Sequence, residues 1–407
     1  MKITKKSHVA VLTAFGFIIY FTSYLTRVGF NTMMVDIALV EGYAESHLSV
    51  AITACFFTYG IGQLISGFLG DRFNPTRIIA LGLSVSTVVN LSIPFAPSPE
   101  VMALLWGLNG LSQAFVYPPL IKTMSVYMTA EQYPNSIMVV AIAGNIGTLA
   151  VSLLSPLIIS ISSWKTAFFC FGGFAVAVIA LWLIYSTHLG KQYGPAVVHK
   201  APEAGVTGSS GIWKPALACG IVFIMISIFA QGFIKDGVTT WMAPYIADVF
   251  EKSSEESILS TFLFPVLSAA GVFLTTFLKK KVIRNELLLS IMYFSAFLVC
   301  LGLLCLLRGS YIASVILLTL MIMVMTSANF AAITFVPVHF AKYGRISLMA
   351  GVLNSCTFIG SAISAYGLGL VRENLGWWAV FVAWATLAAV GILVTLSVLG
   401  RFSKLRD

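Results

Sequence analysis

An arginine lies inside the first long apolar stretch of the chain. The stretch from about Val9 to Met34 is long enough to be a membrane-spanning helix, and Arg27 lies within it. A guanidinium at membrane depth costs several kcal/mol unless it faces a protein interior or a water-filled cavity, and arginine does not lose its proton in proteins. Arg27 is therefore expected to face an aqueous cavity.

Three further polar side chains share the helix face of this arginine. Tyr20, Tyr24, Arg27 and Asn31 follow one another at spacings of four, three and four residues, which places them on one stripe of a helix. Their hydroxyl, guanidinium and amide groups can all form hydrogen bonds. We expect this stripe to line a path for a polar solute.

The composition shows what kind of element holds these residues. Of the 407 residues, 58% are hydrophobic and 10% are charged, and the mean hydropathy is +0.95, whereas a soluble domain is about half apolar and about a quarter charged. An all-α membrane protein is therefore expected. Apolar runs of roughly twenty residues or more predict twelve transmembrane helices, at about residues 9–34, 47–69, 78–96, 101–127, 135–160, 165–187, 214–246, 256–278, 286–306, 310–335, 346–370 and 377–400.

Lysine and arginine are distributed unequally over the two faces that these spans define. Both termini lie on one face, which holds seventeen basic residues against four on the other. Because cytoplasmic loops carry the excess of Lys and Arg, both termini are expected in the cytoplasm of an inner (plasma) membrane protein. This bias, and not nucleic acid binding, explains the net charge of +9. The seventeen are Lys2, Lys5, Lys6, Arg72, Arg77, Lys191, Lys200, Lys214, Lys279, Lys280, Lys281, Arg284, Lys342, Arg345, Arg401, Lys404 and Arg406, and the four are Lys165, Lys252, Arg308 and Arg372.

The spans fall into two groups of six. The longest polar connection, residues 188–213, is rich in Pro, Gly and Ser and predicts a flexible cytoplasmic linker. It separates an expected N-terminal six-helix bundle, residues 1–187, from a C-terminal one, residues 214–407. No connection reaches the roughly 50 residues that a soluble catalytic domain needs, so an enzyme is not expected.

The two halves repeat each other, and the repeat pairs two unusual cations. An offset of 208 residues carries Arg27 to Lys235. The one other basic residue inside a predicted span is Lys122, which snorkelling at the cytoplasmic end of its helix explains as well as a function does. A phosphate monoester carries about −1.5 to −2 charges near pH 7, and two unpaired cations could offset its desolvation. We expect Arg27 and Lys235 to bind an anion that lies between them.

Two aspartates are candidates for proton coupling. Asp36 lies nine residues beyond Arg27, about 13 Å along a helix, which is too far for a direct ion pair. Asp236 follows Lys235 directly, and it is either a structural partner of that lysine or a proton carrier. All six cysteines lie in apolar segments without paired spacing, so neither a disulfide framework nor a metal site is predicted, and no cofactor is expected.

The second span ends in small residues and is followed by charges. Gly67 lies near its end, and Asp71, Arg72 and Arg77 follow at the cytoplasmic surface, where they are expected to form a conformational latch. This stretch resembles the signature loop of the major facilitator superfamily, and the twelve spans, the linker and the repeat match that superfamily over the whole chain. The equivalent loop of the second half keeps basic residues but lacks the aspartate.

Four motifs resemble one family of that superfamily, the organophosphate:phosphate antiporters. The resemblance implies that Arg27 and Lys235 bind the phosphoryl group of the substrate. It adds the tyrosines Tyr20, Tyr24 and Tyr117 to the candidate substrate-binding residues. The motifs are Asp71-Arg72-x-Asn74-Pro75-x-Arg77, Tyr20-x3-Tyr24-x2-Arg27-x2-Phe30, Tyr117-Pro118-Pro119-x2-Lys122-Thr123-Met124 and Lys235-x-Gly237-x3-Trp241-x2-Pro244.

The role of Trp241 is undecided, and three departures from the family pattern leave the identity of the substrate undecided. Trp241 either contacts the substrate or anchors its helix in the aromatic belt of the membrane. Glycerol-phosphate members carry a second cation after the first-helix arginine, a lysine on the second helix and a histidine on the fifth, where this chain has Val28, Gln63 and Gly144. These departures argue against glycerol phosphate and leave open a less highly charged anion.

The sequence therefore predicts a secondary active transporter that exchanges an organic phosphate, or a related organic anion, for inorganic phosphate by alternating access. Two unpaired cations repel each other in the empty carrier and oppose its closure, whereas a bound dianion attracts both cations and favours closure. The carrier is therefore expected to reorient chiefly when an anion is bound, which gives exchange. Two other functions fit: a proton-driven symporter of an organic acid, in which Asp36 or Asp236 titrates, and a membrane sensor of a sugar phosphate. The expected partners are a small anion and the lipid bilayer, with no nucleic acid, and the protein is expected to be a monomer.

Overall fold

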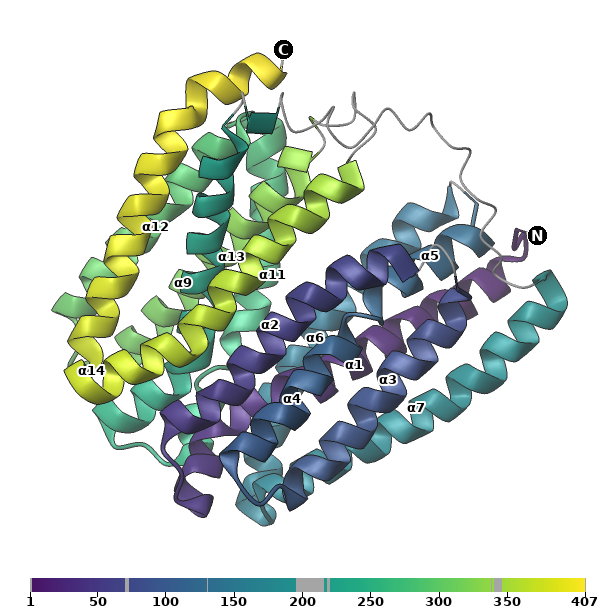
Figure 1. The fold of residues 1–407 in the computed structure, drawn as a ribbon, viewed down its shortest axis with the longest axis horizontal. Helices are drawn as coiled ribbons and strands as arrows, with labels where there is room; N and C mark the ends of the chain where they lie inside the picture. The colour runs from purple at the N-terminus through teal and green to yellow at the C-terminus, as the bar shows by residue number, and fades with distance from the viewer. Residues whose placement is uncertain are drawn as a thin grey trace. The chain divides into compact units, whose positions relative to one another are not determined.

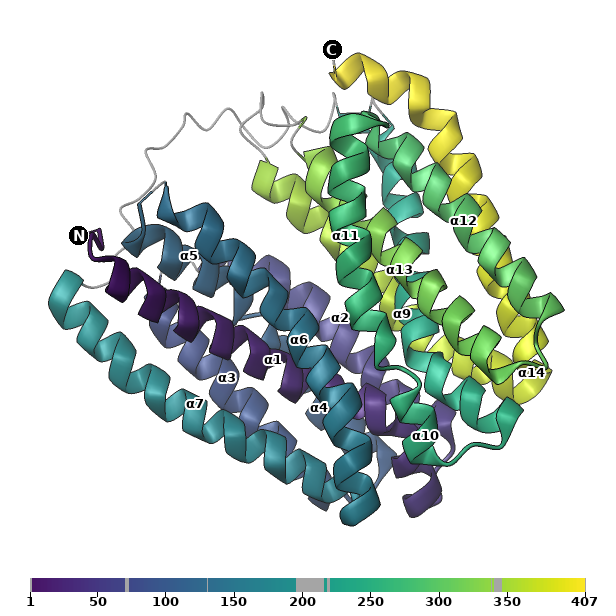
Figure 2. The ribbon, with the colours of Figure 1, turned by 180° about the vertical axis from the view of Figure 1, so that it is seen from behind.

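The computed structural model of the protein is helical in all the regular secondary structure that it describes (Figures 1 and 2). The chain divides into two compact units: unit 1 comprises Met1–Ala201 and Ser254–Pro265, and unit 2 comprises Pro202–Ser253 and Val266–Asp407. The described residues are 2–69, 73–129, 131–194, 216–217, 220–337, 339 and 346–406.

Unit 1 consists of long helices joined by short turns. Helix α1 packs along α6 and α7, α2 packs along α4, and α3 packs along α7, as Figures 1 and 2 both show. The helices are α1 (Lys6–Glu41), α2 (Glu45–Leu69), α3 (Pro75–Ser92) with the single turn η1 (Ile93–Phe95), α4 (Pro99–Gln113), α5 (Tyr117–Tyr127), α6 (Gln132–Ile161), α7 (Trp164–Tyr193) and the short α10 (Ser254–Leu259).

Buried polar side chains tie α1 to α3 and α4. The Thr26 carbonyl accepts hydrogen bonds from the amides of Asn90, at 2.8 Å, and Asn109, at 2.9 Å. The Thr26 hydroxyl accepts a third, from the Gln113 amide at 2.9 Å. All four side chains are buried, where hydrogen bonds between them replace those lost to water. Because Thr26 directly precedes Arg27, this network fixes the backbone that carries the arginine.

The fourth predicted span, residues 101–127, is divided into two helices. Helix α4 ends at Gln113 and α5 begins at Tyr117, with Pro118 and Pro119 in its first turn. Proline lacks an N–H and its ring clashes with the carbonyl four residues earlier, so a helix does not continue through this pair. The break places Tyr117 at the start of a helix and not in the middle of one.

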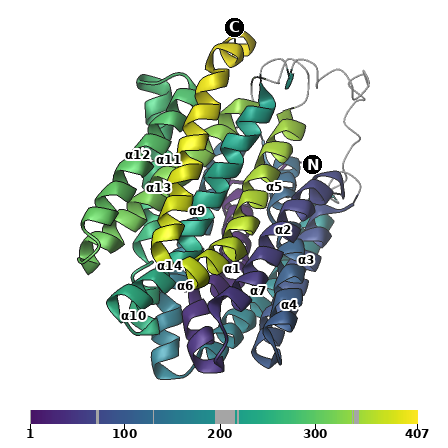
Figure 3. The same cartoon turned by 60° about the vertical axis from the view of Figure 1, so that its left-hand side comes forward.

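Unit 2 contains the remaining long helices. Helix α9 packs along α13 and α14, and α12 packs along both of these as well (Figure 3). Within α14 one residue is not helical, Gly376, with φ 76° and ψ −180°. Because side chains disfavour this conformation, the glycine marks the junction of two helices where the sequence predicts a boundary between the last two spans. The helices are α9 (Ile221–Phe250), α11 (Leu263–Lys281), α12 (Glu286–Leu306), α13 (Tyr311–Phe335) and α14 (Ile346–Arg406).

The predicted spans and linker can be compared with these helices. Over the described ranges, nine helices are long and apolar enough to cross a membrane. Twelve spans are consistent with them when α14 is counted as two and α2 and the α4–α5 pair are added. Helix α7 continues to Tyr193, six residues into the predicted linker, and residues 195–213 lie outside the described residues. Ser254–Pro265 belongs to unit 1, although the sequence division places it in the second half.

Candidate substrate-binding site

Arg27 is half-buried in α1, and two tyrosine rings hold its guanidinium. The guanidinium carbon lies 4.2 Å from the centroid of the Tyr24 ring and 5.0 Å from that of Tyr59, which comes from α2. The Tyr59 hydroxyl is also hydrogen bonded to Arg27 and to Gln63. The faces of aromatic rings carry partial negative charge, so these contacts stabilise the cation without neutralising it.

No acid compensates this arginine within the described part of the chain. The groups that act on its charge are Tyr24, Tyr59, Tyr20 and Cys55, and tyrosine and cysteine side chains are ordinarily neutral at pH 7. The positive charge therefore remains available to a ligand, in agreement with the spacing that places Asp36 out of reach.

The predicted tyrosines of α1 and α5 lie together beside Arg27. Tyr20 stacks on Tyr117 with ring centroids 4.5 Å apart, and its hydroxyl lies 3.4 Å from that of Tyr24. Helix α6 approaches at Gly144, where a Cβ atom would lie 2.7 Å from the Tyr24 ring. We call Arg27, Tyr20, Tyr24, Tyr59 and Tyr117 the Arg27 cluster. Sequence reasoning missed Tyr59, for which the available signal was its position one helical turn before Gln63.

Lys235 lies in α9 and is paired with its chain neighbour. Its Nζ is 3.2 Å from Oδ1 of Asp236, and the two side chains are 20% and 14% exposed. The other oxygen of Asp236 accepts a hydrogen bond from Ser361 of α14. The prediction that Lys235 is an unpaired cation is therefore wrong. Asp236 is its structural partner in this structure, and proton coupling through Asp236 stays a prediction.

Gln231 lies one turn before Lys235 on the same face of α9, and the sequence analysis did not single it out. Its side chain is fully buried. Neither its amide nitrogen nor its amide oxygen has a hydrogen-bond partner among the described residues. Buried amides are normally paired, so a bound water molecule would complete the hydrogen bonding of this one. The four-residue spacing was the signal that could have found it.

Two other candidates point into the interior of their own units. The Trp241 side chain is fully buried, and its indole N–H donates to the Ala365 carbonyl at 3.1 Å, which packs α9 on α14. Asp36 is 5% exposed and accepts a hydrogen bond from Ser254, at the start of α10, at 2.8 Å. Substrate contact by Trp241 and proton transfer by Asp36 gain no support from these contacts and stay predictions.

The predicted latch is described only in part. Asp71 and Arg72 lie outside the described residues. Gly67 lies within α2, and Arg77 is exposed in the first turn of α3. The role of these residues as a conformational latch stays a prediction.

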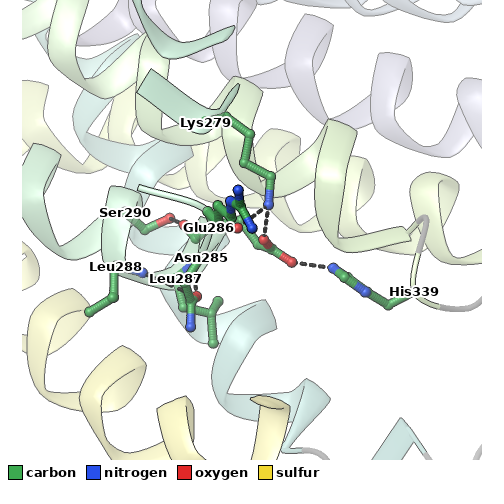
Figure 4. A network of polar contacts seen from close by, with 8 residues as sticks. Lys279, Asn285, Glu286, Leu287, Leu288, Ser290 and His339 are labelled. Atoms are coloured by element: carbon green, nitrogen blue, oxygen red, sulfur yellow. Dashed lines mark hydrogen bonds and ion pairs between the residues drawn. The ribbon is translucent and has the colours of Figure 1, made fainter. Parts of the chain in front are cut away.

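The equivalent loop of the second half contains an acid that the repeat did not predict. Glu286, the first residue of α12, is fully buried, and its carboxylate contacts Lys279 at the end of α11 and His339 beyond α13 (Figure 4). Lys279 is the residue that the 208-residue offset aligns with Asp71. Glu286 lies seven residues beyond Lys279 in the chain, so this loop of the second half does contain an acid.

The comparisons with known families agree with this architecture. A family model described as Major Facilitator Superfamily matches residues 16–365, which is most of the chain. The chain belongs to the Major Facilitator Superfamily. The fold expected from the sequence is thereby confirmed, and the protein belongs among transporters and not among enzymes.

Relatives within the superfamily have names that refer to phosphorylated solutes. The chain is 29% identical to a "Probable hexose phosphate transport protein" of Chlamydia pneumoniae, over 38% of this chain and only 34% of that protein. It is 20% identical to a protein of the same name from Chlamydia trachomatis, over 93% of this chain and 88% of that protein. It is 24% identical to a "Glycerol-3-phosphate transporter" of Bacillus subtilis, over 66% of this chain and 64% of that protein. The resemblance to the organophosphate:phosphate antiporters is thereby confirmed.

A solved structure supports the same fold. The crystal structure of a variant of the nucleoside transporter NupG matches with a TM-score of 0.75 over 96% of this chain and all of that chain, at 13% identity. At this identity the likeness concerns the superfamily fold alone.

Proposed function

We propose that this protein is a secondary active transporter that carries an organic phosphate, or a related organic anion, in exchange for inorganic phosphate. The observation that carries the proposal is Arg27. It is a half-buried cation in a membrane helix, held by the rings of Tyr24 and Tyr59 and compensated by no described carboxylate. Such charges inside membrane helices commonly mark substrate pathways, and a guanidinium offers two parallel N–H donors to an oxoanion.

One further observation supports an anionic substrate. The relatives named above are called transporters of hexose phosphate or glycerol 3-phosphate. Substrate-binding residues are thus proposed in both units, the Arg27 cluster in unit 1 and Lys235 in unit 2. Binding and release on alternate sides of the membrane would give alternating access.

The test is phosphate exchange in proteoliposomes. Vesicles are loaded with labelled inorganic phosphate, and external glucose 6-phosphate is expected to release the label. Arg27→Lys keeps the charge but loses the planar pair of N–H donors, and Arg27→Gln loses both. Exchange should therefore be slower in Arg27→Lys than in the unmodified protein, and slowest in Arg27→Gln. Arg308→Gln removes an exposed arginine beyond α12 and serves as the control. Exchange by Arg27→Gln at the rate of the unmodified protein would contradict the proposal.

The same assay separates the two rival functions. A sensor would bind the ester without releasing label, and a proton symporter would move its anion along a proton gradient with no counter-anion present. The proposed orientation, with both termini in the cytoplasm of the inner membrane, is tested by reporter fusions after Lys200 and Asp407. Reporters that are active on the outer face would contradict it.

A further inference from the structure

Unit 1 contains a groove whose lining residues differ from those of the Arg27 cluster. It runs between the N-terminal half of α1 and the first turns of α6, two helices that lie side by side (Figure 2). Its volume is about 560 Å³, which is within the range of sites that hold small molecules. The lining residues are Lys6, Val9, Ala10, Thr13, Ala14, Phe17, Ile18, Asn135, Ser136 and Val139.

Two small side chains of α1 leave the space for this groove. Ala10 and Ala14 lie one helical turn apart on the same face, and each side chain is a single methyl group. Beside them the Thr13 hydroxyl donates a hydrogen bond of 2.9 Å to the Ser136 hydroxyl, which joins α1 to α6. The Ile18 side chain in the wall remains 38% exposed. The groove is therefore held in place by the contact between the two helices and is open to a ligand.

The charged and apolar parts of the groove are separated along its length. Lys6 is the first residue of α1, Asn135 lies near the start of α6, and both are exposed. None of the ion pairs found among the described residues involves Lys6. Most of the remaining lining is apolar, and the hydroxyls of Thr13 and Ser136 are bonded to each other. The groove thus offers one positive charge at one end and an apolar wall along the rest.

The length of the groove is close to the thickness of one membrane leaflet. From Lys6 to Ile18 helix α1 rises about 18 Å, at 1.5 Å per residue. The hydrocarbon core of a bilayer is about 30 Å thick, so one leaflet accounts for about 15 Å. Because the predicted span begins at about Val9, Lys6 is expected near the lipid headgroups and Ile18 near the middle of the bilayer.

We propose that this groove binds an anionic phospholipid, with one acyl chain along the apolar wall and the negatively charged headgroup at Lys6. A soluble anion would pair with the lysine but leave the apolar wall uncovered. A zwitterionic lipid would cover the wall, but the positive charge of its headgroup would offset the attraction to the lysine. An anionic lipid fits both parts of the groove. The site lies apart from the Arg27 cluster, so this inference does not depend on which solute the protein carries.

The test compares phosphatidylglycerol with phosphatidylcholine of the same acyl chains, since the first lipid carries one negative charge and the second has no net charge. Binding of the first lipid molecule to the purified full-length protein is measured by native mass spectrometry. Phosphatidylglycerol is expected to bind about fivefold more tightly, which is the effect of one lysine near an anionic lipid. Glycerophosphoglycerol, the same headgroup without acyl chains, should not displace it. Equal affinities of the two lipids, or displacement by the headgroup alone, would overturn the proposal.

Lys6→Gln tests the charge. This variant should lose the preference for phosphatidylglycerol and bind the two lipids equally. Lys5→Gln is the matched control, because it removes the same charge from the neighbouring exposed residue, which does not line the groove. The control should keep the preference. If Lys6→Gln keeps it as well, the headgroup does not lie at Lys6 and the proposal is wrong.

Ala14→Phe tests the acyl chain. The new ring occupies the groove, so this variant should lose the first bound lipid of either kind. Val11→Phe adds a ring at an exposed position of the same helix outside the groove and should bind lipid as the unmodified protein does. Unchanged lipid binding in Ala14→Phe would contradict the proposal. The same spectra report the oligomeric state, and a dimer that dissociates in Ala14→Phe would assign the groove to a second copy of the chain instead.

Discussion

The guanidinium of Arg27 is held by contacts that position a charge and do not cancel it. Two tyrosine rings lie against it, and a hydroxyl of one of them is hydrogen bonded to it. An acidic side chain in the same position would fix the Arg27 side chain equally well but would neutralise its positive charge. Tyrosine therefore suits a site that must be rigid when empty and still attract an anion.

Tyr59→Phe tests whether the hydroxyl of this tyrosine, in addition to its ring, positions Arg27. The ring stays in place, but the hydroxyl that is hydrogen bonded to Arg27 and Gln63 is lost. One hydrogen bond is worth about 0.5–1.5 kcal/mol net, so the dissociation constant for the anion should rise about two- to tenfold with little change in unfolding temperature. Tyr43→Phe is the control, because this half-buried tyrosine donates a long hydrogen bond, of 3.4 Å, to the Pro97 carbonyl. Unchanged affinity in Tyr59→Phe would show that the hydroxyl does not position Arg27.

The close approach of Gly144 to the Tyr24 ring gives a second prediction at the residue scale. Alanine in place of glycine within a helix usually stabilises by about 0.5–1 kcal/mol. In Gly144→Ala the new Cβ would lie 2.7 Å from the Tyr24 ring, so the ring must move and its contact with Arg27 changes. We expect a destabilisation of about 1–3 kcal/mol together with weaker anion binding.

Gly173→Ala is the matched control for Gly144→Ala. It lies in α7, and a Cβ atom added there would have no neighbour within 4 Å, so this variant should keep both stability and affinity. Denaturation and titration of the two variants in the same detergent compare them directly. Equal behaviour of the two would contradict the close packing of α6 on Tyr24.

The sequence could predict Arg27 and its tyrosines but not the state of Lys235. Helical spacing alone places Tyr20, Tyr24 and Arg27 on one face, and the structure brings them together. Consecutive helix residues normally point about 100° apart, so the pairing of Lys235 with Asp236 does not follow from their positions. The hydrogen bond from Ser361, which lies 125 residues away in the chain, holds Asp236, and no local pattern reveals such a contact.

At the scale of helices, the apolar runs predict where the spans lie and the polar residues decide how they pack. Pro118 and Pro119 could have located the break between α4 and α5, since their chemistry is local. The hydrogen bonds of Asn90 and Asn109 to the Thr26 carbonyl could not have been found. Each joins residues more than sixty positions apart, and an amide in an apolar run predicts some partner without saying which.

Glu286 joins three elements of unit 2, and the prediction at this scale concerns the stability lost when its charge is removed. Its fully buried carboxylate lies between Lys279 of α11 and His339 (Figure 4). Glu286→Gln keeps the shape but leaves the lysine without its counter-charge. Breaking a buried pair costs about 3–5 kcal/mol, and because Lys279 is about a fifth exposed we expect a smaller loss, of about 1–3 kcal/mol.

The measurement is thermal unfolding of the purified protein, with Glu131→Gln, at an exposed glutamate, as the control. The double variant Glu286→Gln with Lys279→Met should recover part of the loss, because it removes both charges of the pair. If the double variant is no more stable than Glu286→Gln alone, the ion pair is not the source of the stability.

At the scale of the whole carrier, the uncompensated charge of Arg27 is expected to determine which step is slow. When no ligand is bound, Arg27 keeps its positive charge, and closing the protein around it removes that charge from water. A bound anion compensates the charge of Arg27, so closure and reorientation are favoured when the site is loaded. The premise of two repelling cations does not hold in this structure, but exchange is still expected for this second reason.

The prediction is therefore obligatory exchange that moves no net charge. Proteoliposomes loaded with labelled inorganic phosphate should release label at least about tenfold more slowly into medium without phosphate than into medium that contains unlabelled phosphate, which corresponds to about 1.4 kcal/mol in the barrier. A potential of about 100 mV, imposed with a potassium gradient and valinomycin, should leave the exchange unchanged, although one charge moved across that potential would be worth about 2.3 kcal/mol. If label leaves as fast without external phosphate, and leaves faster when the potential favours outward movement of anions, the empty carrier reorients freely and the exchange mechanism is wrong.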